Sequence, residues 1–229
     1  MMLNMDYWND SIKLNNLGVE SLQQGQLDRA AECFRKASEL NAEASYDSPL
    51  EGYGVYSSQW ITLAHMPLHQ MAVGSISATP PCVLAIGDKV PKDSCVHDSE
   101  RQSNVFVTRL DWIIEFNLAT TLQLYSTHAA LSGCCSLLLR ESFQLYGEVA
   151  QDLLEWNNYS ATMDLAMFLM TIYSHQASIC AQWGERKLAL LYRRRLDRIR
   201  HCCAHTTQAE SQRQQITLAL CESQCAPCA

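Results

Sequence analysis

The sequence predicts a predominantly all-α fold, built of antiparallel helical hairpins and interrupted by one strand-containing segment. Apolar residues recur at three- and four-residue steps between residues 11 and 41, between 111 and 153, and again from residue 164, which is the spacing of an amphipathic helix. Five of the six prolines instead fall between Pro49 and Pro91, so no continuous helix passes through that region. A hydrophobic content of 48% with 18% charged residues is typical of a folded chain with a sizeable core.

The stretch from Ser11 to Asn41 has the pattern of two helices joined by a tight turn. Gly25 interrupts the period, and a glycine there suits the left-handed residue that ends a helix. Gly18 and Ala30 are small, which allows two helices to cross closely while larger neighbours fill the seam around them. The residues of the two packing faces are Leu14, Leu17 and Gly18 in the first helix and Ala30, Phe34, Ala37 and Leu40 in the second.

These two faces resemble the signature of the tetratricopeptide repeat (TPR), in the runs Leu14-x2-Leu17-Gly18 and Ala30-x3-Phe34. One such hairpin cannot bury its own hydrophobic face, so the resemblance implies about three or more hairpins stacked as a short α-solenoid. The alternative is a helical hairpin that belongs to some other α fold.

Two later segments resemble the same repeat less closely. In the second, Leu118-Ala119 takes the Leu-Gly place and Ser142-x3-Tyr146 takes the Ala-x3-Phe place. In the third, Met170 stands at the expected place of Gly, and Arg193 stands at the expected place of Phe. The resemblance implies a TPR-like domain over residues 1–205 with an insertion at 48–108 between its first two hairpins, followed by a polar, cysteine-containing helix or tail at 206–229.

The insertion carries two candidate strands. Tyr53–Leu63 is rich in aromatic and β-branched residues, which favours a strand, and Val105–Thr108 is its expected antiparallel partner. Between them, Ser75–Gln102 contains paired prolines and a polar run, and we expect it to be a mobile loop.

An asparagine recurs at one place of the repeat. Asn16 immediately precedes Leu17, and Asn117 immediately precedes Leu118, as in repeats of the kinesin light chain type, which this pattern resembles. That resemblance implies a concave groove in which the amides bond the backbone of an extended peptide, since an amide both donates and accepts. The groove residues expected from it are Asn15, Asn16, Val19, Asn117, Thr120 and Gln123.

Two further expectations follow from the groove. Asn→Ala at either site should weaken a bound peptide and barely change the melting temperature, whereas Leu17→Ala should cost stability. The pattern that holds chaperone C-termini is missing, because Asn15 and Val19 occupy its positions. The alternative is that the asparagines serve helix packing or are simply exposed.

The function expected from this resemblance is a non-catalytic protein-protein interaction module that binds a peptide or helix of another protein. We expect no catalytic residue, cofactor or metal, because no phosphate loop, dinucleotide fingerprint or His-Glu-x-x-His motif occurs. The alternative is a metal- or redox-responsive protein that uses a C-terminal Cys/His cluster. Its residues would be His201, Cys202, Cys203, His205, Cys221, Cys225 and Cys228.

Charge and hydropathy limit which kinds of partner and which cellular compartment we expect. The net charge of -7 disfavours nucleic acid, and residues 185–200, with seven Lys or Arg and two Asp or Glu, are interpreted as a polar helix face. No stretch approaches about 18 apolar residues, so no membrane association is expected. The first ten residues lack a basic start and an apolar run, and the cysteines resemble small buried hydrophobes, so we expect a cytoplasmic protein.

Overall fold

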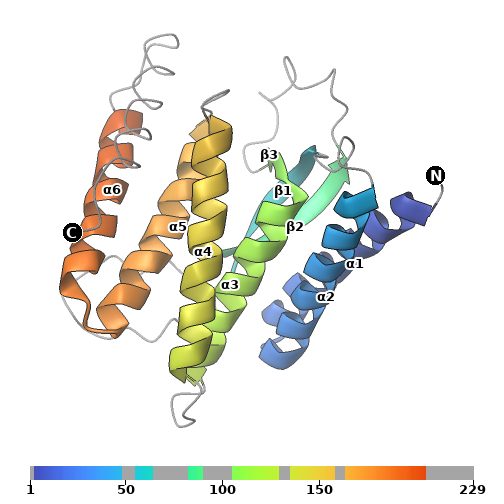
Figure 1. The fold of residues 1–229 in the computed structure, drawn as a ribbon, viewed down its shortest axis with the longest axis horizontal. Coiled ribbons are helices and arrows are strands. Elements are labelled where there is room, and N and C mark those ends of the chain that lie inside the picture. Colours follow the sequence, from blue (N-terminus) through green and yellow to red (C-terminus); the bar gives the residue numbers. More distant parts are fainter. Residues whose placement is uncertain are drawn as a thin grey trace. The chain divides into compact units, whose positions relative to one another are not determined.

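The computed structural model describes residues 3–47, 55–63, 82–89, 105–128, 135–157 and 163–204, in which six helices and three strands are found (Figure 1). The fold is predominantly helical, and the helices form the hairpins α1/α2, α3/α4 and α5/α6. The chain divides into two compact units, Met1–Leu145 and Tyr146–Ala229, with the boundary inside α4. The helices are α1 (Leu3–Gln23), α2 (Leu27–Asp47), α3 (Leu110–His128), α4 (Cys135–Asn157), α5 (Met163–Gln182) and α6 (Arg186–Ala204), and the strands are β1 (Val55–Thr62), β2 (Cys82–Lys89) and β3 (Val105–Arg109).

The α1/α2 hairpin is held by small residues at its crossing. A Cβ atom on Gly18 would lie 2.7 Å from the ring of Phe34, so the aromatic ring occupies the space that glycine leaves. Ser11 donates a hydrogen bond of 2.6 Å to the carbonyl of Ala37 across the same seam. The close crossing predicted for Gly18 is therefore confirmed. The α2 residues that are fully buried along this face are Ala30, Phe34, Ala37 and Ala44.

The turns of the first and third hairpins have one geometry. Gly25 and Gly184 have φ values of 74° and 78°, the left-handed conformation that glycine adopts without strain. Each glycine N–H donates to the carbonyl three residues before it: Gly25 donates to Leu22, and Gly184 donates to Ala181. The next N–H along bonds the carbonyl five residues before it in both hairpins, which completes a Schellman cap. The predicted role of Gly25 is confirmed.

The shared turn corrects the register that we expected in the third hairpin. Gly18 lies seven residues before Gly25, and the residue seven before Gly184 is Ala177, which is small and 2% exposed. Ala177, and not Met170, therefore takes the place of Gly18. By the same count His175 corresponds to Asn16.

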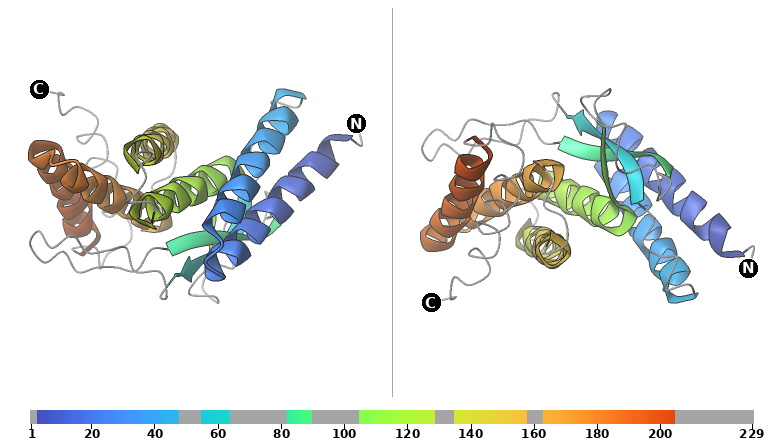
Figure 2. Two further views of the ribbon diagram at one scale, coloured as in Figure 1. Left: turned by 90° about the horizontal axis from the view of Figure 1, so that it is seen from below. Right: turned by 90° about the horizontal axis from the view of Figure 1, so that it is seen from above.

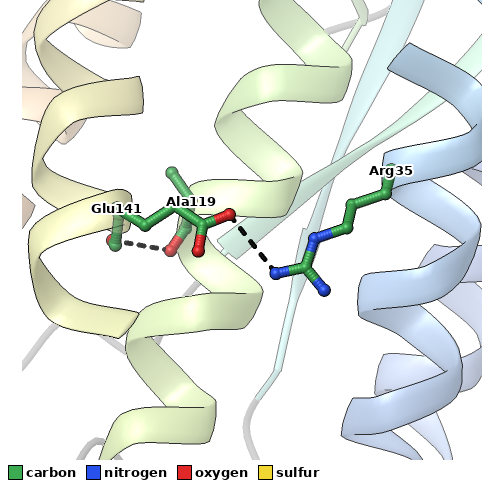
Figure 3. A network of polar contacts seen from close by, with 4 residues as sticks. Arg35, Ala119 and Glu141 are labelled. Atoms are coloured by element: carbon green, nitrogen blue, oxygen red, sulfur yellow. Dashed lines mark hydrogen bonds and ion pairs between the residues drawn. The ribbon is translucent and has the colours of Figure 1, made fainter. Parts of the chain in front are cut away.

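Helix α3 is buried along most of its length; it packs against α1, α2 and the sheet, and the start of α4 contacts it. Ser142 on α4 donates a hydrogen bond of 2.7 Å to the carbonyl of Ala119 on α3. Figure 3 shows this bond beside an exposed ion pair, 3.3 Å long, from Arg35 of α2 to Glu141 of α4. The buried hydroxyl fixes the contact, since an exposed ion pair contributes only about 0–1 kcal/mol.

The three strands form an antiparallel sheet in the order β2-β1-β3, which packs against the first helices α1 and α3 (Figure 2). Strand β1 pairs with β3 from Val55↔Arg109 to Gln59↔Val105, so the predicted pairing is confirmed. The expectation of a loop over Ser75–Gln102 is wrong for Cys82–Lys89, which is a strand paired with β1.

The second unit contains a stacked aromatic pair next to its helical hairpin. The rings of Tyr146 on α4 and His175 on α5 lie 5.0 Å apart at an interplanar angle of 22°. Burial lowers the pKa of His175 to about 4, so the imidazole is neutral at pH 7. The predicted helix or tail at 206–229 lies outside the described residues.

Candidate functional site

Three asparagines from two helices meet on the backbone of β2. Asn15 and Asn16 come from α1, and Asn117 comes from α3. Because consecutive helical residues differ in direction by about 100°, Asn15 turns deeper into the unit than Asn16. Asn15 and Asn117 are fully buried, and Asn16 is partly buried. We call these three residues the asparagine cradle.

Asn117 bonds one peptide unit in both directions. Leu84 N–H donates to Asn117 Oδ1 at 2.8 Å, and Asn117 Nδ2 donates to the Leu84 carbonyl, also at 2.8 Å. Asn15 Nδ2 reaches the same carbonyl at 3.1 Å, and Asn117 Nδ2 also donates to Asn15 Oδ1 at 2.9 Å. The two asparagines thus form one network around Leu84, although Asn15 and Asn117 are 102 residues apart.

Asn16 repeats the arrangement two residues further along β2. Ile86 N–H donates to Asn16 Oδ1 at 2.9 Å, and Asn16 Nδ2 donates to the Ile86 carbonyl at 2.8 Å. Residues i and i+2 of a strand direct their backbone groups to the same edge. Asn16 and Asn117 therefore serve one edge of β2 as a neighbouring strand would, while β1 pairs with its other edge.

The apolar side chains of β2 fill the space between the helices and the rest of the sheet. Val83 and Leu84 are fully buried, and Ile86 is 5% exposed. Val83 belongs to a core cluster with residues of α1, α2 and α3 and with Leu63, which follows β1, namely Val19, Leu22, Ala30, Phe34, Leu63, Leu118, Leu122 and Leu124. The cradle fixes the backbone of a strand whose side chains belong to the core of the first unit.

The burial of the cradle changes one expectation from the sequence. A buried polar group that loses its hydrogen-bond partner costs about 1–3 kcal/mol. Asn117→Ala would remove the acceptor of Leu84 N–H and the donor to Asn15 Oδ1. The expectation that Asn→Ala leaves the melting temperature unchanged is therefore corrected for Asn117, because its amide supports the fold.

The other expected groove residues face inward. Val19 is 4% exposed and belongs to the core cluster. Thr120 is buried and donates to the carbonyl of Phe116 in its own helix at 2.9 Å, and Gln123 is fully buried. The first unit therefore presents no open groove at these positions: the face expected to receive a peptide is covered by β2.

Most residues of the expected repeat signature are buried. Leu14 and Leu17 are partly buried, and the others are buried, namely Gly18, Ala30, Phe34, Leu118, Ala119, Ser142 and Tyr146. Leu118 is buried beside Asn117, whereas Leu17 is only partly buried, like Asn16. What sequence reasoning missed is the strand that the asparagines hold.

The C-terminal Cys/His residues give no metal centre within the part of the chain that the structure describes. There, no three His, Cys, Asp or Glu side chains are grouped closely enough to hold a metal ion. Cys202 and Cys203 are partly buried near the end of α6, and burial raises the pKa of the Cys203 thiol. His205, Cys221, Cys225 and Cys228 lie outside the described residues.

The second unit has a hollow of about 370 Å³ between α4, α5 and α6. Its lining includes Glu155, Gln176, Tyr192 and Arg195. Among the described residues, no cysteine or histidine lines it, so they supply no Cys-His nucleophile pair there.

The chain matches no protein-family model, no curated protein and no solved structure. Among the described helices, none combines the length and the apolar character that crossing a membrane requires.

Proposed function

We propose that this chain is a non-catalytic protein-interaction module of TPR-like hairpins, which binds an extended segment of another protein on the asparagine cradle. One observation carries the proposal: Asn16 and Asn117 each bond both the N–H and the C=O of a single residue in an extended backbone. Such contacts recognise the main chain and leave side-chain preference to the surrounding pockets.

The two-way bonds favour an extended ligand over a helical one. Inside a helix, the N–H and C=O groups are already paired with residues four positions away. A strand instead offers both groups of residues i and i+2 at one edge, which matches the spacing of Leu84 and Ile86 on the cradle. Of the two ligands expected from the sequence, the extended peptide is therefore the one that we propose.

Several features support the TPR-like part of the proposal. The glycine turn recurs in the first and third hairpins, and a small buried residue, Gly18 or Ala177, precedes each turn by seven positions. Helix α2 packs against α3, as the second helix of one repeat packs against the first helix of the next in a solenoid. Asn16 and Asn117 both precede a leucine on a first helix. The buried thiols of Cys33 and Cys180 are compatible with the reducing cytoplasm.

Photo-cross-linking of selected peptides tests the proposal. Random dodecapeptides are selected on the full chain, and a photoreactive p-benzoylphenylalanine is placed at Glu20, an exposed α1 residue one turn after Asn16. The matched control carries the same group at Glu39, which is exposed on α2. We expect cross-links at position 20 and not at 39. Selected peptides that cross-link only at 39, or a selection that yields no binder, would contradict the proposed site.

A further inference from the structure

We infer that β2 is the resident occupant of the cradle, and that the partner is an extended aliphatic segment that takes the place of β2. This inference rests on the proposed function and specifies the chemistry of its partner. Both edges of β2 are in use, one by β1 and the other by the asparagine cradle. A second extended segment therefore reaches the cradle only when β2 leaves it.

The order of the sheet allows this exchange. Strand β2 lies at the edge of the order β2-β1-β3, and β1 is also paired with β3 over Val55–Gln59. Removal of β2 therefore leaves a two-stranded antiparallel pair and the helices α1, α2 and α3 of the first unit with their own backbone hydrogen bonds. The groups that lose partners are the amides of the cradle and the open edge of β1, and an incoming strand satisfies all of them.

The environment of β2 defines which segment fits. At the positions of Leu84 and Ile86 the segment needs backbone N–H groups, which excludes proline, and aliphatic side chains, because both are buried. At the position of Val83 it needs an aliphatic residue that fits a fully buried site. At Gly87 a Cβ atom would lie 2.5 Å from Ser57 Oγ, which favours glycine. The motif is two aliphatic residues, a small residue, an aliphatic residue and glycine.

One cross-strand pair allows β2 to be locked. Thr62 on β1 is opposite Cys82 on β2, and Thr62 Oγ1 lies 3.9 Å from Cys82 Sγ. The backbone groups of Leu84 and Ile86 point to the cradle and away from β1. Cys82 lies two residues before Leu84, so its backbone groups also point away from β1. Thr62↔Cys82 is therefore a pair without mutual backbone hydrogen bonds. The Cα atoms of such pairs are about 4.5 Å apart, within the range of a disulfide. Thr62→Cys therefore gives a reversible covalent lock.

The probe is a fluorescent peptide with the sequence of residues 82–89 and serine in place of cysteine, titrated against the full chain. Because β2 belongs to the same chain, it competes with the peptide intramolecularly, so binding to the unmodified chain is weak. We expect oxidised Thr62→Cys to bind no peptide and reductant to restore binding. The oxidised unmodified chain controls for other disulfides. Leu84→Pro, which removes an N–H bonded by Asn117, should bind the peptide at least tenfold more tightly.

Each outcome separates the two hypotheses. Equal binding by oxidised and reduced Thr62→Cys would overturn the replacement of β2, while cross-linking at Glu20 would then still support a peptide-binding module whose site lies on α1 outside the cradle. Replacement on the cradle is supported if Leu84→Pro binds the peptide more tightly than the unmodified chain and the double variant Leu84→Pro, Asn16→Ala does not. If Leu84→Pro does not fold, the reversible lock alone decides. Dimers of the reduced chain in which a second copy supplies β2 would overturn the assignment of the site to another protein.

Discussion

Asn117 and Leu84 exchange two hydrogen bonds of 2.8 Å, one in each direction. Asn117 on α3 and Leu84 on β2 are both fully buried. The side-chain amide here occupies the place of a neighbouring strand. This relationship joins the helical part of the first unit to its sheet. Substitution of Asn117 therefore measures how strongly β2 is held by the helices.

Asn117→Ala should lower the free energy of unfolding of the first unit by roughly 2–4 kcal/mol, because up to two buried groups lose a partner at about 1–3 kcal/mol each. Chemical denaturation followed by circular dichroism measures this loss. Asn9→Ala, at an exposed position of α1, is the matched control and should change stability by no more than about 0.5 kcal/mol. Equal effects of the two changes would contradict the network.

Replacement of residues 82–89 by a Gly/Ser sequence of equal length should lower the melting temperature of the first unit. Leu84→Ala alone should lower the free energy of unfolding by about 2–5 kcal/mol, because the Leu84 side chain is fully buried. Hydrogen exchange should become faster in α1 and α3, which pack against β2, and remain unchanged in α5 and α6. An unchanged melting temperature would instead support the loop that we expected from the sequence.

Gly18→Leu or Ala30→Leu should destabilise the α1/α2 hairpin by about 1–3 kcal/mol or more, because both positions are tightly packed. Gly18→Ala with Phe34→Leu isolates the cause. The alanine should be costly when Phe34 is present and cost less beside the smaller leucine, so the two changes should couple in a double-mutant cycle. Strictly additive effects would show that the ring does not fill the glycine site.

The stability of the second unit should fall as the pH is lowered from about 6.5 to about 4. The folded pKa of His175 is about 4, below the ordinary value of 6.5, so the unfolded chain binds more protons in this window. The loss should reach on the order of 3 kcal/mol at the acid end. Denaturation at several pH values measures it. His175→Phe keeps a ring against Tyr146 and should remove this part of the pH dependence.

The helical hairpins could be predicted because their signals are local. The three- and four-residue period, Gly25 at a left-handed turn and Gly18 at a close crossing each depend on neighbours in sequence or one turn away. The pairing of β1 with β3 was also predictable, because aromatic and β-branched residues mark both strands.

Strand β2 could not be predicted in the same way. Cys82–Lys89 is a short apolar run between prolines and a polar segment, and its stabilising partners are remote: Asn16 lies 70 residues from Ile86 and Asn117 lies 33 residues from Leu84. The recurrence of asparagine before leucine indicated contact with an extended backbone. It carried no information about which backbone, because an amide that bonds the main chain accepts any sequence.

The wide spacing of the cradle along the chain also orders events during synthesis. The α1/α2 hairpin is complete at Asp47, but its asparagines have no strand to hold until β2 is made, and the network closes only after α3 ends at His128. At about 5–20 residues per second, roughly 4–16 s separate these two points. For that interval the residues of α1 and α2 exist without β2 and α3, so the cradle has no strand to bond and Val19 and Leu22 lack their later neighbours.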